Sequence, residues 1–178
     1  MARYWVRRAD GAIARPASVG EALVNDARFA LTPEVALLPG PPECCLWDGS
    51  AFLVDAALLA ALKARLADRI DALALARAAL TVTTPAGTFR IRRDDIERYT
   101  AIGFAALFAR LTSAPFSITV RDADGLEVTL NQDQTLRLLA AIGQRYYTVF
   151  QQAEGRKAQL ASATAEQLRD LDPEAGIG

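Results

Sequence analysis

The spacing of apolar positions changes several times along the chain, and each change indicates a different element. Residues 3–8 are rich in strand formers, residues 9–11 (Ala-Asp-Gly) are a turn signal, and residues 12–15 can return as the partner strand. A second hairpin, with Asp-Gly at its tip, is predicted over residues 46–54. The first 54 residues are therefore predicted to form a β-rich module.

A long helix is predicted to follow this module. Asp55 stands at an N-cap position, and leucines then recur every seven residues up to residue 80. The candidate oligomer or packing seam of this helix consists of Leu59, Leu62, Leu66, Leu73 and Leu80. Two interpretations stay open: the seam pairs with another helix, in an antiparallel hairpin or by parallel self-association, or it packs on the following domain. A helix lying on a membrane is disfavoured, because its polar face mixes acids and bases.

From residue 81 onwards the pattern alternates between strand and helix periods. The predicted elements are a hairpin at 80–91, a helix at 94–111, a hairpin at 116–130, a helix at 132–162 and a short helix with Thr164 as a plain N-cap. Gly143 lies within the apolar stripe of the longest helix, where a missing side chain would let another backbone come close.

Together these elements predict an α+β fold. A β-rich N-terminal module (residues 1–54) is followed by a long connecting Ala/Leu-rich helix (55–80) and by a C-terminal domain of β-hairpins packed against helices (81–172). Residues 173–178 are predicted to be a frayed tail.

Composition excludes several kinds of chemistry. The chain has no His, which rules out Ser-His-Asp catalysis and His-ligated zinc within one subunit. Cys44 and Cys45 are adjacent, so two buried thiols are expected rather than a disulfide. The net charge of −1 gives no field that would gather nucleic acid. No signal peptide and no apolar run of about 20 residues is visible, so we expect synthesis in the cytoplasm and no membrane span.

Two groups of carboxylates invite a metal or acid–base interpretation. The first, at a predicted helix start, is Asp94, Asp95 and Glu97. The second, at a predicted hairpin tip, is Asp122, Asp124 and Glu127. Capping and the helix dipole account for the first group, and the second lacks the later carboxylate that a calcium loop needs. We therefore predict no catalytic, metal or cofactor-binding residues.

A few other side chains are candidates for binding. The densest positive patch is Arg90, Arg92, Arg93 and Arg98, which neighbouring acids partly cancel. Tyr146 and Tyr147 could stack on a sugar, although Tyr146 is more simply a core residue at its helical spacing. Trp5 and Trp47 are the candidate partner contacts, because indoles concentrate at the centres of interfaces.

A family resemblance extends this picture. It rests on residues 116–130 (Phe-Ser-Ile-Thr-Val-Arg-Asp-Ala-Asp-Gly-Leu-Glu-Val-Thr-Leu), on Trp47 to Phe52 before the Ala/Leu-rich helix, and on Gln151, Gly155, Lys157 and Leu160 before the Ser-Ala-Thr-Ala-Glu-Gln-Leu run. Over about residues 45–172, the chain resembles a small domain that recurs in bacteriophage tail gene clusters, often beside genes for tail fibres and their assembly factors. The resemblance implies a component or helper of the tail and brings no active-site residues.

The function we expect is a non-enzymatic structural component of a bacteriophage tail, either a tail-fibre or a fibre-attachment protein. It would be synthesised in the host cytoplasm, be located in the virion, and bind other tail proteins and itself, with a homotrimer preferred. By analogy with phage tail proteins that dock through a terminal module, residues 1–54 would be its attachment module, and the protein would contribute to host attachment. One alternative is a tail-fibre assembly chaperone that is absent from the mature virion. A further alternative is a host-glycan-binding domain that uses Tyr146, Tyr147 and a carboxylate pair.

Overall fold

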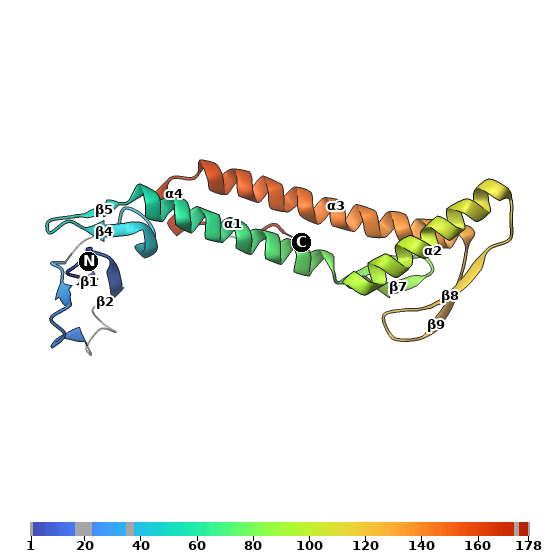
Figure 1. Ribbon diagram of the computed structural model, residues 1–178, viewed down its shortest axis with the longest axis horizontal. Helices are drawn as coiled ribbons and strands as arrows, with labels where there is room; N and C mark the ends of the chain where they lie inside the picture. The colour runs from blue at the N-terminus through green and yellow to red at the C-terminus, as the bar shows by residue number, and fades with distance from the viewer. Residues whose placement is uncertain (1, 17–22, 35–37, 173–174, 178) are drawn as a thin grey trace. The chain divides into compact units, whose positions relative to one another are not determined.

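Short antiparallel hairpins alternate with helices along the chain, in agreement with the predicted α+β class (Figure 1). This computed structural model describes residues 2–16, 23–34, 38–172 and 175–177. The helices are η3 (Pro42–Cys44), α1 (Ala56–Ala78), α2 (Arg93–Thr112), α3 (Gln132–Ser162) and α4 (Ala165–Arg169). The strands are β1 (Tyr4–Arg7), β2 (Ile13–Pro16), β3 (Phe29–Leu31), β4 (Cys45–Trp47), β5 (Phe52–Val54), β6 (Thr81–Thr84), β7 (Gly87–Arg90), β8 (Ser117–Arg121) and β9 (Glu127–Asn131).

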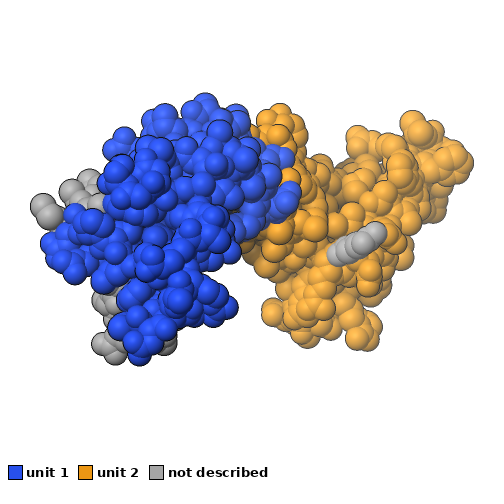
Figure 2. Space-filling model, turned by 60° about the vertical axis from the view of Figure 1, so that its left-hand side comes forward, with its two compact units in different colours: residues 1–69, 156–173 blue, residues 70–155, 174–178 orange. Residues whose placement is uncertain are grey.

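The chain divides into two compact units that do not follow the predicted domain boundaries. Unit 1 contains residues 1–69 and 156–173, and unit 2 contains residues 70–155 and 174–178 (Figure 2). The long helices α1 and α3 are each shared between the units. The sequence pattern of a helix is continuous, but the two halves of the helix can pack on different neighbours. The helix predicted at 55–80 is therefore present, but it is not a separate structural unit.

Unit 1 contains both predicted N-terminal hairpins. β1 pairs with β2 and also with β3, a strand that the sequence pattern did not indicate, in the order β2-β1-β3. β4 and β5 form the second hairpin. The backbone N–H of Trp47 donates to the carbonyl of Gly11 over 2.9 Å, which joins the two hairpins. Gly11 has a φ of +69°, and a Cβ there would lie 3.0 Å from the Trp47 nitrogen, so this junction requires glycine.

Two caps define the helix starts in unit 1. Asp55 Oδ1 accepts the backbone N–H of Leu58 at 2.8 Å, which confirms the predicted N-cap of α1. At α4, Thr164 Oγ1 accepts the N–H of Gln167 at 3.2 Å, and Gln167 Oε1 accepts the N–H of Thr164 at 2.8 Å. Thr164 is thus part of a full capping box rather than a plain cap, because Gln167 lies at the required third helical position.

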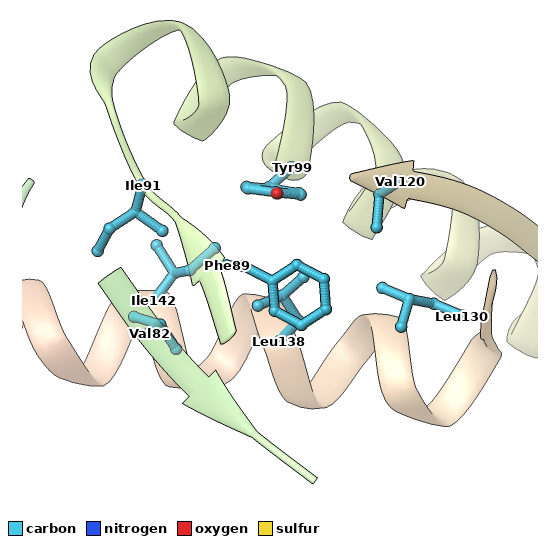
Figure 3. Packing of buried hydrophobic residues seen from close by; sticks show 8 residues of the cluster. All are labelled: Val82, Phe89, Ile91, Tyr99, Val120, Leu130, Leu138 and Ile142. Carbon is cyan, nitrogen blue, oxygen red and sulfur yellow. The ribbon is translucent and has the colours of Figure 1, made fainter. Parts of the chain in front are cut away.

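The core of unit 2 lies between two hairpins and two helices (Figure 3). Val82 of β6 faces Phe89 of β7 in register, and Val120 and Leu130 come from β8 and β9. Tyr99 points from α2 into the same layer, where its ring meets that of Phe89 edge to face at 6.4 Å. The remaining members of this cluster are Ile91, Leu138 and Ile142. Side chains that alternate with these along the strands, such as Thr81 and Arg90, are exposed, as expected for hairpins with one buried face.

Two predictions about unit 2 are wrong. Gly143 is exposed, and a Cβ on it would meet nothing within 4 Å, because it lies about 100° around the helix from the buried Ile142. The glycine at a close approach is Gly103 of α2, which faces Leu139. In the predicted frayed tail, Ile177 is 1% exposed and is therefore a core residue. Residues 173, 174 and 178 of that tail lie outside the described residues.

Candidate functional site

One carboxylate of the first group, Asp95, caps the start of α2. Asp95 Oδ2 accepts the backbone N–H of Arg92 at 3.3 Å, and Asp95 Oδ1 lies 3.6 Å from the guanidinium of Arg98. Asp94 and Glu97 are exposed. Arg98 also lies over the ring of Tyr99, with its Cζ 5.2 Å from the ring centre. The capping interpretation is confirmed for Asp95, which leaves the other two carboxylates facing solvent.

The second group of carboxylates forms a hairpin tip, as predicted. Asp122 Oδ1 accepts the backbone N–H groups of Asp124 and Leu126, both at 2.9 Å, which closes the turn between β8 and β9. Glu127 lies 4.0 Å from the guanidinium of Arg121 across the hairpin. Within the part of the chain that the structure describes, no group of three or more His, Cys, Asp and Glu side chains could hold a metal ion.

The two cysteines are buried free thiols, as predicted. Cys44 is 0% exposed and Cys45 is 1% exposed, and neither is part of a disulfide. Burial, with a smaller contribution from the adjacent Cys44, raises the pKa of the Cys45 thiol to about 11, and burial also raises the pKa of the Cys44 thiol. Both thiols are therefore protonated near neutral pH and are poor nucleophiles.

The leucines of the predicted α1 seam have very different surroundings. Leu62 is 6% exposed and belongs to the core of unit 1, while Leu80 is 56% exposed in unit 2. Leu59, Leu66 and Leu73 are half-buried. The structure therefore uses Leu62 for packing within the chain, and the role of the seam in assembly stays a prediction.

The first part of α1 and the end of α3 line one groove in unit 1. An apolar groove there is lined by Ala60, Lys63, Ala64, Ala67, Lys157, Leu160 and Ala161. Lys63 Nζ donates to the carbonyl of Ala161 over 2.8 Å. Four of these seven lining residues are alanines, whose small side chains remove little area from water.

The aromatic candidates are mostly part of internal packing. Trp5 is 7% exposed in unit 1, and Trp47 is half-buried with its ring 5.0 Å from that of Phe52. Tyr146 packs against the core cluster of unit 2, and its ring stacks on Phe150 at 6.1 Å. Tyr147 is 64% exposed. The two tyrosines thus do not share one face, which follows from their adjacent positions on a helix.

Among the described residues, the most exposed large apolar side chains lie on α2, on a face that we did not predict from the sequence. We call this surface the α2 apolar face. It consists of Ala101, Phe104, Leu107, Phe108 and Leu111. Phe104 is 66% exposed, Phe108 is 69% exposed and Leu111 is 76% exposed. Figure 3 shows Tyr99 directed from α2 into the core, and the helical spacing turns Phe104 and Phe108 away from that side.

A signal for this face was present in the sequence. Ala101, Phe104, Phe108 and Leu111 follow the 3-4-3 spacing of one helix stripe, while Tyr99, Ala106 and Ala109 form a second stripe that is buried. Only one side of a helix is needed to pack on the core of its own domain, so a second apolar side is available for another contact. The α2 apolar face is therefore the candidate functional site of the chain.

Most of the chain matches one family of domains. Residues 47–175 match the family described as "Domain of unknown function (DUF4376)", and the chain belongs to this family. The matched range begins at Trp47 in β4 and includes α2 with its apolar face. The comparisons found no match among curated proteins or solved structures. Among the described residues, no helix has both the length and the apolar character needed to cross a membrane.

Proposed function

We propose that the chain is a non-enzymatic structural component of a bacteriophage tail, a tail-fibre or fibre-attachment protein that acts through protein–protein assembly. The observation that supports assembly is the α2 apolar face, whose two phenylalanines are about two-thirds exposed. Its large side chains expose on the order of 400 Å² of mainly apolar surface, if each offers roughly 200 Å² in full. Contiguous apolar patches of this size on soluble proteins are commonly interaction sites.

The connection with a phage tail is supported by the sequence resemblance over about residues 45–172. An assembly role also agrees with buried, protonated thiols and with carboxylates that cap a helix and close a turn. In the proposed role, the chain acts by binding other proteins through its surface and not through reactive side chains. Localisation in the virion and a contribution to host attachment are parts of this proposal.

Self-association through α1 belongs to the same proposal, with a homotrimer as the preferred state. Leu66 and Leu73 are half-buried, so each keeps some apolar surface for a second copy. Sedimentation of the full chain and of Leu66→Asp tests this part. A trimer that Leu66→Asp disrupts supports it, and a monomer in both forms removes it.

Mass spectrometry of purified phage particles tests the proposed function. The particles are prepared from the phage that encodes the chain, and the chain is quantified relative to the known tail proteins. A stoichiometric amount supports a virion component. Absence from the particle, together with capture on fibre subunits in infected cells, supports the assembly chaperone instead, since a transient helper would also need an exposed apolar face. If the chain is absent from the particle and is not captured on fibre subunits, neither the structural role nor the chaperone role holds.

A further inference from the structure

One edge of strand β6 has no neighbouring strand. β6 and β7 form a two-stranded sheet, and within the described part of the chain β6 pairs with no other strand. The outer edge of β7 is different, because the backbone N–H of Ala123, in the turn between β8 and β9, donates to the carbonyl of Thr88 over 2.8 Å. The β6–β7 hairpin therefore has one edge that another part of unit 2 covers and one edge without a strand.

The register of the hairpin shows which backbone groups of β6 point towards this edge. The N–H of Ile91 donates to the carbonyl of Leu80 over 3.2 Å, and hydrogen-bonded pairs in an antiparallel ladder recur at every second residue. Val82 is two residues after Leu80, so its N–H and C=O groups bond to β7. The N–H and C=O groups of Thr81 and Thr83 point the other way, towards the edge without a strand.

The side chains agree with this register. Thr83 Oγ1 lies 3.0 Å from Thr88 Oγ1, a close approach that is typical of a pair that is not hydrogen-bonded through the backbone. Within the described residues, no hydrogen bond outside the β6–β7 ladder uses the backbone groups of Thr81 or Thr83. Both residues are exposed, so these groups are available to an added chain.

A groove of about 400 Å³ lies beside this edge, and we call it the β6–α3 groove. β6 contributes Thr81, Val82 and Thr83 to its lining. The lining residues from α3 are Ala141, Gln144, Arg145 and Thr148. Val82 of β6 and Ile142 of α3 belong to one core cluster and lie beside each other in Figure 3. A chain added to the edge of β6 would therefore also contact α3.

Among the described residues that line the groove, Arg145 alone is charged. Its Nη2 donates to the carbonyl of Arg77 over 2.8 Å, and its Nε is buried without a hydrogen-bond partner. Arg145 makes no ion pair within the part of the chain that the structure describes. The guanidinium is thus held by a backbone carbonyl, and no carboxylate balances its charge.

The surrounding sequence carries the same sign of charge. Residues 72–93 and 134–153, which include β6, β7 and every lining residue, contain no Asp or Glu. Besides Arg145, the charged residues of these two ranges are Arg77, Arg90, Arg92, Arg93 and Arg137. Of the acids that border the ranges, Asp133 lies 3.8 Å from the guanidinium of Arg110, and Asp94 is exposed at the start of α2. Asp71 and Glu154 have partners other than Arg145.

We propose that the β6–α3 groove binds an extended segment of a partner protein as an added strand, with an Asp or Glu of that segment facing Arg145. Its backbone would pair with Thr81 and Thr83, which lie about 7 Å apart, the repeat of an extended chain. Its residue opposite Val82 would point to the same side as Val82, towards α3, where Arg145 lies. This proposal goes beyond the proposed function, because it stands on a surface other than the α2 apolar face.

Two other occupants match the groove less well. A second copy that pairs through its own β6 brings a second Arg145 to the same side of the sheet, and its β6, β7 and residues 134–153 supply no carboxylate. A nucleic acid would place phosphates on Arg145. Phosphate oxygens of its backbone only accept hydrogen bonds, so the carbonyl groups of Thr81 and Thr83 would gain no donor from them.

Fluorescence anisotropy of the full-length chain with three labelled peptides tests the proposal. The first peptide alternates Thr and Val around a central Glu, and the second has Gln in place of this Glu. The third keeps the Glu but carries N-methyl groups on the two residues beside it, which would face Thr81 and Thr83. We expect the first peptide to bind about fivefold more tightly than the second and about tenfold more tightly than the third.

Two variants of the chain, each with a matched control, test the two sets of contacts. Thr83→Pro removes an outward N–H and should weaken binding of the Glu peptide about tenfold. Thr83→Val removes the hydroxyl but keeps this N–H, and it should bind as the unmodified chain does. Arg145→Gln should abolish the preference for Glu over Gln. Arg137→Gln, at an exposed position of α3 outside the groove, should keep it.

Circular dichroism checks that every variant is folded, and the three peptides test the proposal on the unmodified chain even if Thr83→Pro is not. Equal binding of the Glu and Gln peptides, or no binding of either, would overturn the proposal. Equal binding of the Glu peptide and its N-methylated form would overturn strand addition. A lower oligomeric state of Thr83→Pro than of Thr83→Val in sedimentation would make a second copy the occupant. If the peptides fail while the chain is stoichiometric in virions, the inference about the groove is wrong and the proposed function stands.

Discussion

Leu139 of α3 occupies the space that a side chain on Gly103 of α2 would need. A Cβ on Gly103 would lie 3.2 Å from Leu139 Cγ and closer still to Cδ2. Gly103 has an ordinary helical backbone and is buried, so packing rather than φ requires glycine at this position. This contact allows α2 to approach α3 within unit 2, with the core cluster on one side of α2 and the α2 apolar face on the other.

Gly103→Val should lower the free energy of unfolding by about 2 kcal/mol, because overpacking outweighs the gain in helix propensity. Adding Leu139→Ala should recover part of this loss, since the smaller side chain gives the new Cβ room. The same Val substitution at Gly143, where a Cβ meets nothing within 4 Å, should change stability by less than about 0.5 kcal/mol. Urea denaturation measures all four chains, and equal effects at the two glycines would contradict this account.

Phe89→Ala should cost about 3–5 kcal/mol, because this ring is 0% exposed at the centre of the unit 2 core and leaves a cavity. Phe108→Ala removes the same side chain from the α2 apolar face, where the ring is 69% exposed. We expect its effect to be below about 0.5 kcal/mol. Thermal or urea unfolding, followed by circular dichroism, compares the stability of the two variants. A large loss of stability in Phe108→Ala would show that the α2 apolar face is covered within the chain.

Asn131→Ala should lower stability by about 1 kcal/mol through loss of the cap of α3. Asn131 Oδ1 accepts the N–H of Gln134, and Gln134 Oε1 accepts the N–H of Asn131, both at 2.9 Å. Gln134→Ala removes one of these two bonds and should cost less than Asn131→Ala. Arg137→Ala, at an exposed position of the same helix, is the control. If Arg137→Ala is as destabilising as Asn131→Ala, the capping bonds do not stabilise the start of α3.

Raising the pH should destabilise unit 1 through Cys45. Its pKa is about 11 in the folded chain and 9.0 in an ordinary thiol, so the folded state holds the proton more tightly. The resulting stabilisation is complete below pH 9 and is lost as the pH rises through 11, with a maximum on the order of 2 kcal/mol. The urea midpoint should therefore decrease more between pH 8 and pH 10.5 for the unmodified chain than for Cys45→Ala. Equal losses in the two chains would contradict this contribution.

The elements that the sequence predicted well are those formed by neighbours along the chain. In the β4–β5 turn, Asp48 Oδ1 accepts the N–H groups of Ser50 and Ala51, both at 2.8 Å. Asp55 bonds to a residue three positions later. Such contacts depend on residue type and spacing over a few residues, which a sequence displays directly. The contact of Thr164 with Gln167 is of the same kind, and the sequence predicted Thr164 as a plain cap but missed the bond from Gln167 back to Thr164.

The choice between Gly143 and Gly103 was of a different kind. Both glycines lie in helices with apolar stripes, and only the position of α3 against α2 determines which one meets a neighbour. The same holds for Ile177, whose burial depends on where the chain end returns. These are contacts between residues far apart in sequence, which periodicity within one helix does not encode.

The sequence by itself determined the α+β class, the hairpin turns, the helix caps and the pair of buried thiols, since short-range hydrogen bonds and local hydrophobic spacing specify them. Only the tertiary structure decided which side of α2 is buried. Tyr99 and Phe108 both occupy apolar helical positions, but the core of unit 2 has room for one side of the helix. Packing around Tyr99 therefore leaves Phe108 on the outer surface, where it is available to a partner.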